Sequence, residues 1–181
     1  MMIKGSKVGL RAVEKEDLDQ LKDWRNIPEF RKNFRETKEL SSKNQEIWFE
    51  SLQKTQAVNF MFVIERLSDK ELLGAAGLLY TNWAIRSADV SFYIGYEKKY
   101  IDEEGYAEDA AKVLFDYGFN ELNLNKVWME LYEYDHKKLD FFKNKFKFKE
   151  DGKLRENCFY EGRYWDSFIL SLLKKEFISE G

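Results

Sequence analysis

DEEGYAEDA, residues 102–110, carries the chain from a predicted strand into its longest predicted helix. Small and apolar side chains recur at helical spacing through that helix, the clearest periodic signal in the sequence: Ala107, Ala110, Ala111, Leu114, Phe115, Gly118 and Phe119. Glycine and small residues at a strand-to-helix junction let backbone N–H groups approach an anion, and the helix N-terminus adds partial positive charge. An ordinary loop leading into a helix fits the same residues, so the junction predicts an anion site only together with other features.

The segments on either side predict strands and further helices. Residues 7–13 alternate like a half-buried strand, and a short helix follows that ends before Pro28. A second helix is expected to open at Ser42, with Gln45 completing a capping box. The other expected elements are strands at 58–64, 72–80 and 88–95, a strand at 127–132, a short helix at 139–146, and strands at 148–159 and 164–173. The order βααβββαβαββ predicts an α/β fold with helices on the faces of one mixed sheet.

Composition and charge exclude several classes of protein. The net charge is −3 from 30 basic and 33 acidic residues, which gives no overall attraction to nucleic acid or an anionic membrane. No linker or repeat interrupts the chain, so residues 1–181 are expected to form one domain. The first residues lack the apolar run of a signal peptide, and no stretch reaches the roughly eighteen apolar residues of a membrane span. Cys158 is the only cysteine and His136 the only histidine, so we expect a reducing, cytoplasmic location and no metal site.

The junction and its surroundings resemble the GNAT acyltransferases, whose signature is Gln/Arg-x-x-Gly-x-Gly/Ala at the start of the helix after the fourth strand. Gly105 and Ala107 match the last two signature positions, with Tyr106 between them. The likeness extends over almost the whole chain through these segments: Trp24-Arg25-Asn26 with Pro28, Glu133-Tyr134-Asp135, and the stretches 152–156 and 162–166. They look like the branch that contains ribosomal-protein N-terminal acetyltransferases and sugar-nucleotide amine acetyltransferases.

The resemblance implies a V-shaped opening between the fourth and fifth strands, here 88–95 and 127–132, which takes acetyl-coenzyme A (acetyl-CoA). Pantetheine would pair with the backbone of Tyr93, Ile94 and Gly95. The pyrophosphate would lie beside Asp102, on the amides of Glu103, Glu104, Gly105, Tyr106 and Ala107. Asp135, Phe142 and Lys143 are the coenzyme-side candidates of the next helix.

Two positions depart from the family pattern. Asp102 replaces the basic or amide residue of the signature, and Glu103 and Glu104 follow it. Two like charges about 4 Å apart repel by roughly 1 kcal/mol in water and more at lower dielectric, so coenzyme affinity should be weakened, with Lys98 and Lys99 compensating in part. A loop that has lost coenzyme binding is the alternative.

The second departure concerns the acid that protonates the leaving sulfur. If Asp135 matches the family asparagine, Phe142 occupies the position of the tyrosine acid, whereas the other register pairs His136 with Lys143. The first register is preferred because Glu133 and Tyr134 keep their family neighbours. Phe142 has no proton to donate, so the thiolate leaves unassisted, or water, Tyr134 or Tyr132 supplies the proton.

The acceptor side has weaker candidates. Asp89 matches a position that is often acidic in this branch and is the preferred base, with a salt-bridging carboxylate as an equal alternative. The residues expected to shape the acceptor pocket are Trp24, Arg25, Arg31, Phe34, Trp48, Trp83 and Trp165. For each tryptophan a place in the core is equally expected. Arg25, Arg31 and Arg35 would suit an acidic or phosphorylated acceptor, or simply face water.

The sequence therefore predicts an acetyl-CoA-dependent N-acetyltransferase that acts on the primary amine of a small molecule or a protein N-terminus. An amino-sugar nucleotide is the alternative acceptor. A catalytically silent protein that binds coenzyme A is the alternative class, favoured by the acidic turn and Phe142. A monomer or homodimer is expected, without nucleic-acid or membrane partners.

Overall fold

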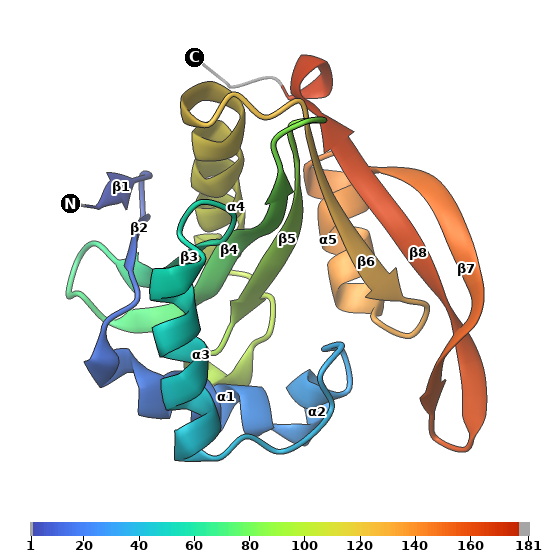
Figure 1. Cartoon of the computed structure of the whole chain (residues 1–181), viewed down its shortest axis with the longest axis horizontal. Helices are drawn as coiled ribbons and strands as arrows, with labels where there is room; N and C mark the ends of the chain where they lie inside the picture. Colours follow the sequence, from blue (N-terminus) through green and yellow to red (C-terminus); the bar gives the residue numbers. More distant parts are fainter. Residues whose placement is uncertain (1, 178–181) are drawn as a thin grey trace.

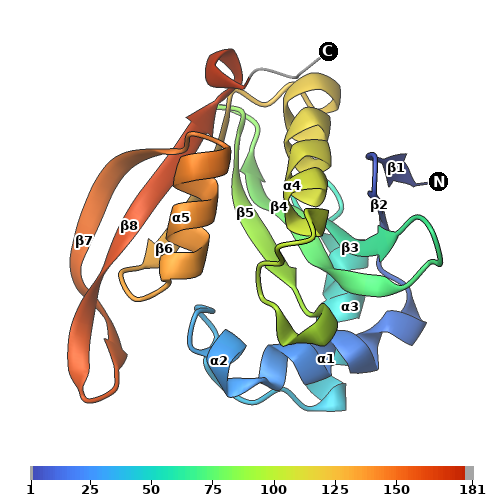
Figure 2. The same cartoon turned by 180° about the vertical axis from the view of Figure 1, so that it is seen from behind.

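The computed structural model describes residues 2–177 as one eight-stranded sheet with helices on both faces (Figures 1 and 2). The strands are β1 (Ile3–Lys4), β2 (Val8–Ala12), β3 (Phe60–Arg66), β4 (Leu72–Asn82), β5 (Ser87–Ile94), β6 (Lys126–Tyr132), β7 (Lys149–Tyr160) and β8 (Arg163–Leu173). The helices are α1 (Leu18–Asn26), α2 (Pro28–Arg31), α3 (Ser42–Lys54), α4 (Tyr106–Asp116) and α5 (His136–Lys145), besides short turns of helix. Strand order is β1-β2-β3-β4-β5-β6-β8-β7, and every neighbouring pair is antiparallel except β5 and β6.

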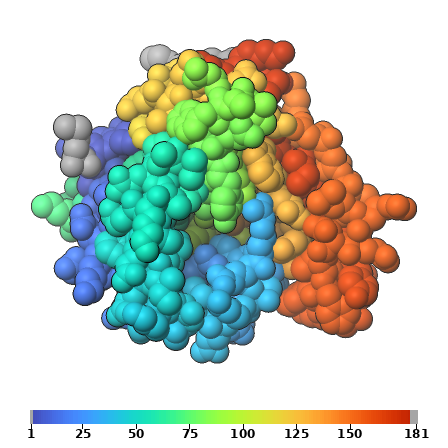
Figure 3. Space-filling view, viewed as in Figure 1, coloured from blue at the N-terminus to red at the C-terminus, as the bar shows by residue number. Residues whose placement is uncertain are grey.

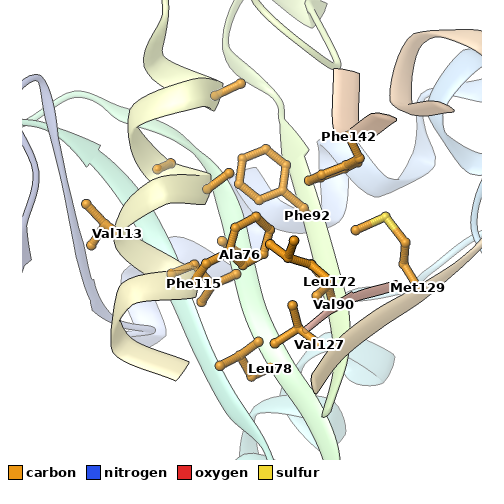
Figure 4. Close-up of a cluster of buried hydrophobic side chains, with 14 of the residues drawn as sticks. Ala76, Leu78, Val90, Phe92, Val113, Phe115, Val127, Met129, Phe142 and Leu172 are labelled. Atoms are coloured by element: carbon orange, nitrogen blue, oxygen red, sulfur yellow. The ribbon is translucent and has the colours of Figure 1, made fainter. Parts of the chain in front are cut away.

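Helices α4 and α5 cover one face of the sheet, and α1 and α3 cover the other (Figures 1 and 2). Strand β5 lies in the middle and is buried along nearly its whole length, as expected for a strand covered on both faces. Strand β6 instead alternates buried and half-buried residues with a period of two. On the α4 side, Phe92, Phe115 and Phe142 meet in an apolar core (Figure 4).

The predicted opening between the family's fourth and fifth strands corresponds to the gap between β5 and β6. Its presence confirms the expected fold. These strands pair at only three positions, Ser87 with Lys126, Ala88 with Val127, and Asp89 with Trp128. Beyond Asp89 they separate, because β5 stays paired with β4 while β6 stays paired with β8 along its whole length. Figure 1 shows the gap widening towards the ends of both strands, with the loop after α2 at its wide end.

The predicted element order is confirmed, and three local details differ. Strand β1 and helix α2 were not expected, and Pro28 begins α2, where its missing N–H needs no partner. The cap of α3 is Ser41, which exchanges hydrogen bonds with Asn44, so the predicted box at Ser42 and Gln45 is wrong by one residue. Residues 118 and 119 lie in a wider helical turn after α4. No helix among residues 2–177 is long and apolar enough to cross a membrane.

Candidate active site

Two carboxylates stand where β5 and β6 separate. Asp89 ends the paired part of β5, and Glu130 lies on β6 two residues past Trp128, the partner of Asp89. Arg35, from the loop after α2, reaches both: its Nη1 is 2.6 Å from Asp89 Oδ2 and its Nε is 3.6 Å from Glu130 Oε2. Burial raises the pKa of Asp89, although Arg35 opposes that rise. The predicted base is therefore a buried carboxylate with an arginine partner.

Hydrogen bonds cross the wide end of the opening. The Tyr100 hydroxyl, after β5, donates to Asp135 Oδ2 across 2.7 Å, and Asp135 caps α5 after β6. Lys137 Nζ donates to the Lys99 carbonyl at 3.3 Å. Burial and the Asp135 charge raise the pKa of Tyr100, so its hydroxyl remains a donor. These contacts join the segment after β5 to the first turn of α5.

Part of the predicted pantetheine-binding edge of β5 is already hydrogen-bonded within the protein. The Ile94 N–H donates to the Tyr100 carbonyl and the Gly95 N–H to the Leu73 carbonyl, so both amides already have partners. Because backbone groups alternate in direction along a strand, Phe92 and Val90 turn theirs to the same side as Ile94, towards β6. Phe92, which the sequence did not single out, lies beyond the last β5–β6 pair and is on the strand edge that faces the opening.

The turn before α4 has the conformation of an anion-binding turn, and a carboxylate of the turn itself occupies the anion position. Gly105 has φ +87°, which a side chain disfavours, and it precedes the first turn of the helix. The Asp102 carboxylate accepts hydrogen bonds from Tyr106 N at 2.9 Å and Ala107 N at 2.6 Å. Lys7 Nζ donates to the Glu104 carbonyl. A diphosphate that binds these two amides has to displace the Asp102 carboxylate. This competition is how the departure of Asp102 from the family signature affects the site.

The candidate acids differ in what they contact. Phe142 is fully buried against Phe92 and Phe115, so the structure turns this position of α5 towards β5 (Figure 4). The Tyr134 hydroxyl donates to the Lys32 carbonyl at 2.7 Å and lies 3.3 Å from Cys158 Sγ. Burial and the contact with Cys158 raise the pKa of Tyr134, so this phenol keeps its proton.

Lys138 is a buried cation beside the opening that sequence reasoning missed. Its ammonium lies 4.6 Å from the Tyr100 ring centre and 5.5 Å from that of Phe34. Burial lowers its pKa to about 8, although Asp135 favours the charged form. In the sequence Lys138 is one of many lysines near α5, and only its spacing from Phe142, four residues further on, places it on the inward side of the helix.

A cavity of about 260 Å³ opens between α1, α3 and the sheet on the acceptor side. Figure 3 shows the surface hollowed between α3 and the loop after α2. Of the predicted acceptor residues, Arg25 and Trp48 line it, together with Tyr93 at its base. The Arg25 guanidinium stacks on Phe34, with its Cζ 4.0 Å from the ring centre.

Other predicted residues lie away from this cavity. Trp83 is on the β4–β5 hairpin, at the opposite end of β5 from Tyr93, and its indole donates to the Ala57 carbonyl. Trp24 is buried in the core against Gly95, and Trp165, on β8, packs on Tyr134. Arg31 pairs with Glu39 at 3.6 Å, and Lys143 pairs with Glu150 on β7. For the two tryptophans Trp24 and Trp165 the structure favours packing.

The fold and the opening define an acyltransferase of the GNAT type. The chain belongs to the GNAT acetyltransferase domain family, whose model matches residues 7–142. It is thus an acetyl-CoA-dependent N-acetyltransferase, which confirms the predicted activity.

The most similar proteins found are mainly polyamine acetyltransferases. A spermidine N(1)-acetyltransferase of Vibrio cholerae is 28% identical over 177 residues, covering 96% of this chain and 97% of that protein. An uncharacterized N-acetyltransferase of Bacillus licheniformis, p20, is 28% identical over 173 residues, 93% of both chains. The crystal structure of the V. cholerae enzyme in complex with CoA and spermine has a TM-score of 0.84 at 26% identity, covering 94% of this chain and 97% of that one. These relatives do not single out the ribosomal-protein and sugar-nucleotide branch.

The residues of the opening fit the coenzyme in most respects. The Phe92 edge, the left-handed Gly105 and the start of α4 suit a pantetheine arm and a diphosphate, and Asp102 is the mismatch. When bound, acetyl-CoA supplies the thioester carbonyl carbon that an amine attacks.

Proposed function

We propose that the protein acetylates a primary amine of a polyamine, with acetyl-CoA as the donor. The observation that carries this proposal is the likeness, over 94% of the chain, to a structure that holds both CoA and spermine. Asp89 and Glu130 support it, because negative charge at the point of strand separation attracts an ammonium group.

We further propose that Asp89 accepts the ammonium proton, directly or through a water molecule. An amine attacks only after losing this proton, and the raised pKa of Asp89 makes it a stronger base than an exposed carboxylate. Tyr134 is the proposed donor to the leaving sulfur, which requires its hydroxyl to turn from the Lys32 carbonyl. We likewise propose that the coenzyme-binding and acceptor-binding residues predicted from the sequence bind those two substrates.

The test offers acetyl-CoA with spermidine, spermine, a peptide with a free N-terminus, and an amino-sugar nucleotide, and follows thiol release and product mass. We expect turnover with the two polyamines. Asp89→Asn should lower kcat by about 100-fold or more, whereas Asp140→Asn, an exposed carboxylate on α5, should not. Turnover of the peptide or sugar nucleotide alone would refute the acceptor class, and an unchanged Asp89→Asn would refute the base.

A second candidate acceptor carries negative charge next to its amine, as the amino-sugar nucleotide does. The observation in its favour is that Arg25 and Lys38 line the acceptor cavity, and Arg25 Nε is buried without a hydrogen-bond partner in the described chain. Glu36 is the cavity's opposing carboxylate and pairs with Lys38 at 2.8 Å. A KM for the sugar nucleotide below that for spermidine would favour this candidate.

Assembly and location are also proposals. The expected monomer or homodimer is at odds with the solved dodecamer of the V. cholerae enzyme, so we propose to measure the mass by light scattering with and without spermine. The single, free Cys158 supports a reducing cytoplasmic location.

A further inference from the structure

Asp89, Glu130 and Trp128 together form a site for an organic cation. The two carboxylates stand on adjacent strands, on either side of the point where β5 and β6 separate. The Arg35 guanidinium fills this site, 2.6 Å from Asp89 and 3.6 Å from Glu130, with its Cζ 5.8 Å from the Trp128 ring centre. Carboxylates and an aromatic face are the groups that bind ammonium and guanidinium ions.

The carboxylates are fixed by the sheet, whereas the cation comes from a connecting loop. The Asp89 and Glu130 side chains are only 7% and 15% exposed. Glu130 Oε1 is also held by Asn157 Nδ2 at 2.6 Å and Ser167 Oγ at 2.7 Å. The Arg35 side chain is 48% exposed and lies between α2 and α3. The guanidinium can therefore withdraw to solvent while both strands keep their pairing.

We infer that the Arg35 guanidinium occupies the binding site of the acceptor ammonium, and that an amine binds by displacing this guanidinium from Asp89 and Glu130. The inference rests on the proposed function, because it takes the acceptor to be a primary amine. Two shielded carboxylates without a counter-ion are unfavourable, so the site holds a cation whether or not substrate is present. A second cation beside Arg35 would be repelled by the guanidinium and by the buried Lys138, whose charge interacts with that of Asp89. Arg35 is thus a specificity-determining residue that sets the amine affinity.

The experiment measures binding without acetyl-CoA, so it does not depend on turnover. Thermal-shift titrations with 1,4-diaminobutane and with ethylguanidine would be run on the wild type, Arg35→Ala, Arg35→Gln and Arg35→Lys. Lys43→Ala is the control, because it removes one exposed cation that pairs with Glu46 on α3. Steady-state kinetics with spermidine would then separate kcat from KM.

Both neutral variants should bind diaminobutane at least about tenfold more tightly than the wild type, because no tethered cation competes. Ethylguanidine should bind these variants in competition with the diamine. Arg35→Lys and Lys43→Ala should resemble the wild type. With spermidine, the amine KM should fall while the acetyl-CoA KM stays unchanged.

Unchanged or weaker diamine binding in both neutral variants would overturn the inference. A purely structural role for Arg35 predicts a lower melting temperature with no change in amine affinity. If Arg35→Ala does not fold, Arg35→Gln, which keeps a hydrogen-bond donor, decides alone. Tighter diamine binding without polyamine turnover would leave this inference standing and refute the proposed function, and polyamine turnover without tighter binding would do the reverse.

Discussion

Replacing Lys138 by methionine should stabilise the protein at neutral pH. Lys138 is 6% exposed, and burial lowers its pKa from 10.5 to about 8. Each unit of pKa corresponds to 1.36 kcal/mol, so burying the charged form costs the folded state about 3 kcal/mol. Methionine removes that cost, but it also loses the cation–π contacts with the Tyr100 and Phe34 rings, worth about 2 kcal/mol together at this buried position. We expect a net gain of about 1 kcal/mol at pH 7.

The pH dependence identifies the cause of this gain. Below pH 8 the lysine is charged in both states, and the full cost is present. Between pH 8 and 10.5 the unfolded chain holds a proton that the folded chain has released, so wild-type stability rises with pH relative to the variant. The advantage of Lys138→Met should therefore disappear by about pH 10.5.

Urea unfolding followed by tryptophan fluorescence at pH 7 and pH 10 measures both effects. Lys137→Met, at an exposed neighbouring lysine on the same helix, is the control and should change stability by no more than about 0.5 kcal/mol. A variant less stable than wild type at pH 7, or a difference that does not shrink as pH rises, would refute the reasoning.

Three further changes test the site and the core. Asp102→Ala should tighten CoA binding in calorimetry, because it frees the amides of Tyr106 and Ala107, and should cost about 0.5–2 kcal/mol in stability through the lost helix cap; weaker CoA binding would contradict this. Gly105→Trp should abolish CoA binding in the same assay, and intact affinity would exclude the turn as the phosphate site. Phe142→Tyr should raise kcat for thiol release if this position carries the missing acid, at a stability cost of about 1–3 kcal/mol for a buried hydroxyl; an equal or lower kcat would reject the assignment.

The sequence predicted the fold because its signals are local. The apolar spacing along α4 and the alternation along β6 are set by neighbours a few residues away, and both are confirmed. The family signature located the opening between β5 and β6 from Gly105 and Ala107, and this too is confirmed.

The contacts of the site could not be predicted because they join distant segments. Arg35 meets Asp89 across 54 residues, and Tyr100 meets Asp135 across 35. The sequence placed three carboxylates at the turn, but only the structure shows that Asp102 points back to its own helix. The charge of a side chain can be read from the sequence, but the direction in which it points depends on the backbone conformation of the whole turn.

The three-pair seam between β5 and β6 divides the sheet into two leaves of unequal size. One leaf contains β1 to β5, and the other contains β6, β8, β7 and α5. Because only three backbone pairs join the two leaves, a molecule that binds in the gap and contacts both of them should reduce the motion of one leaf relative to the other. Amides of β6 and β8 should therefore gain more protection from hydrogen exchange on coenzyme binding than those of β2 and β3, which lie within the larger leaf.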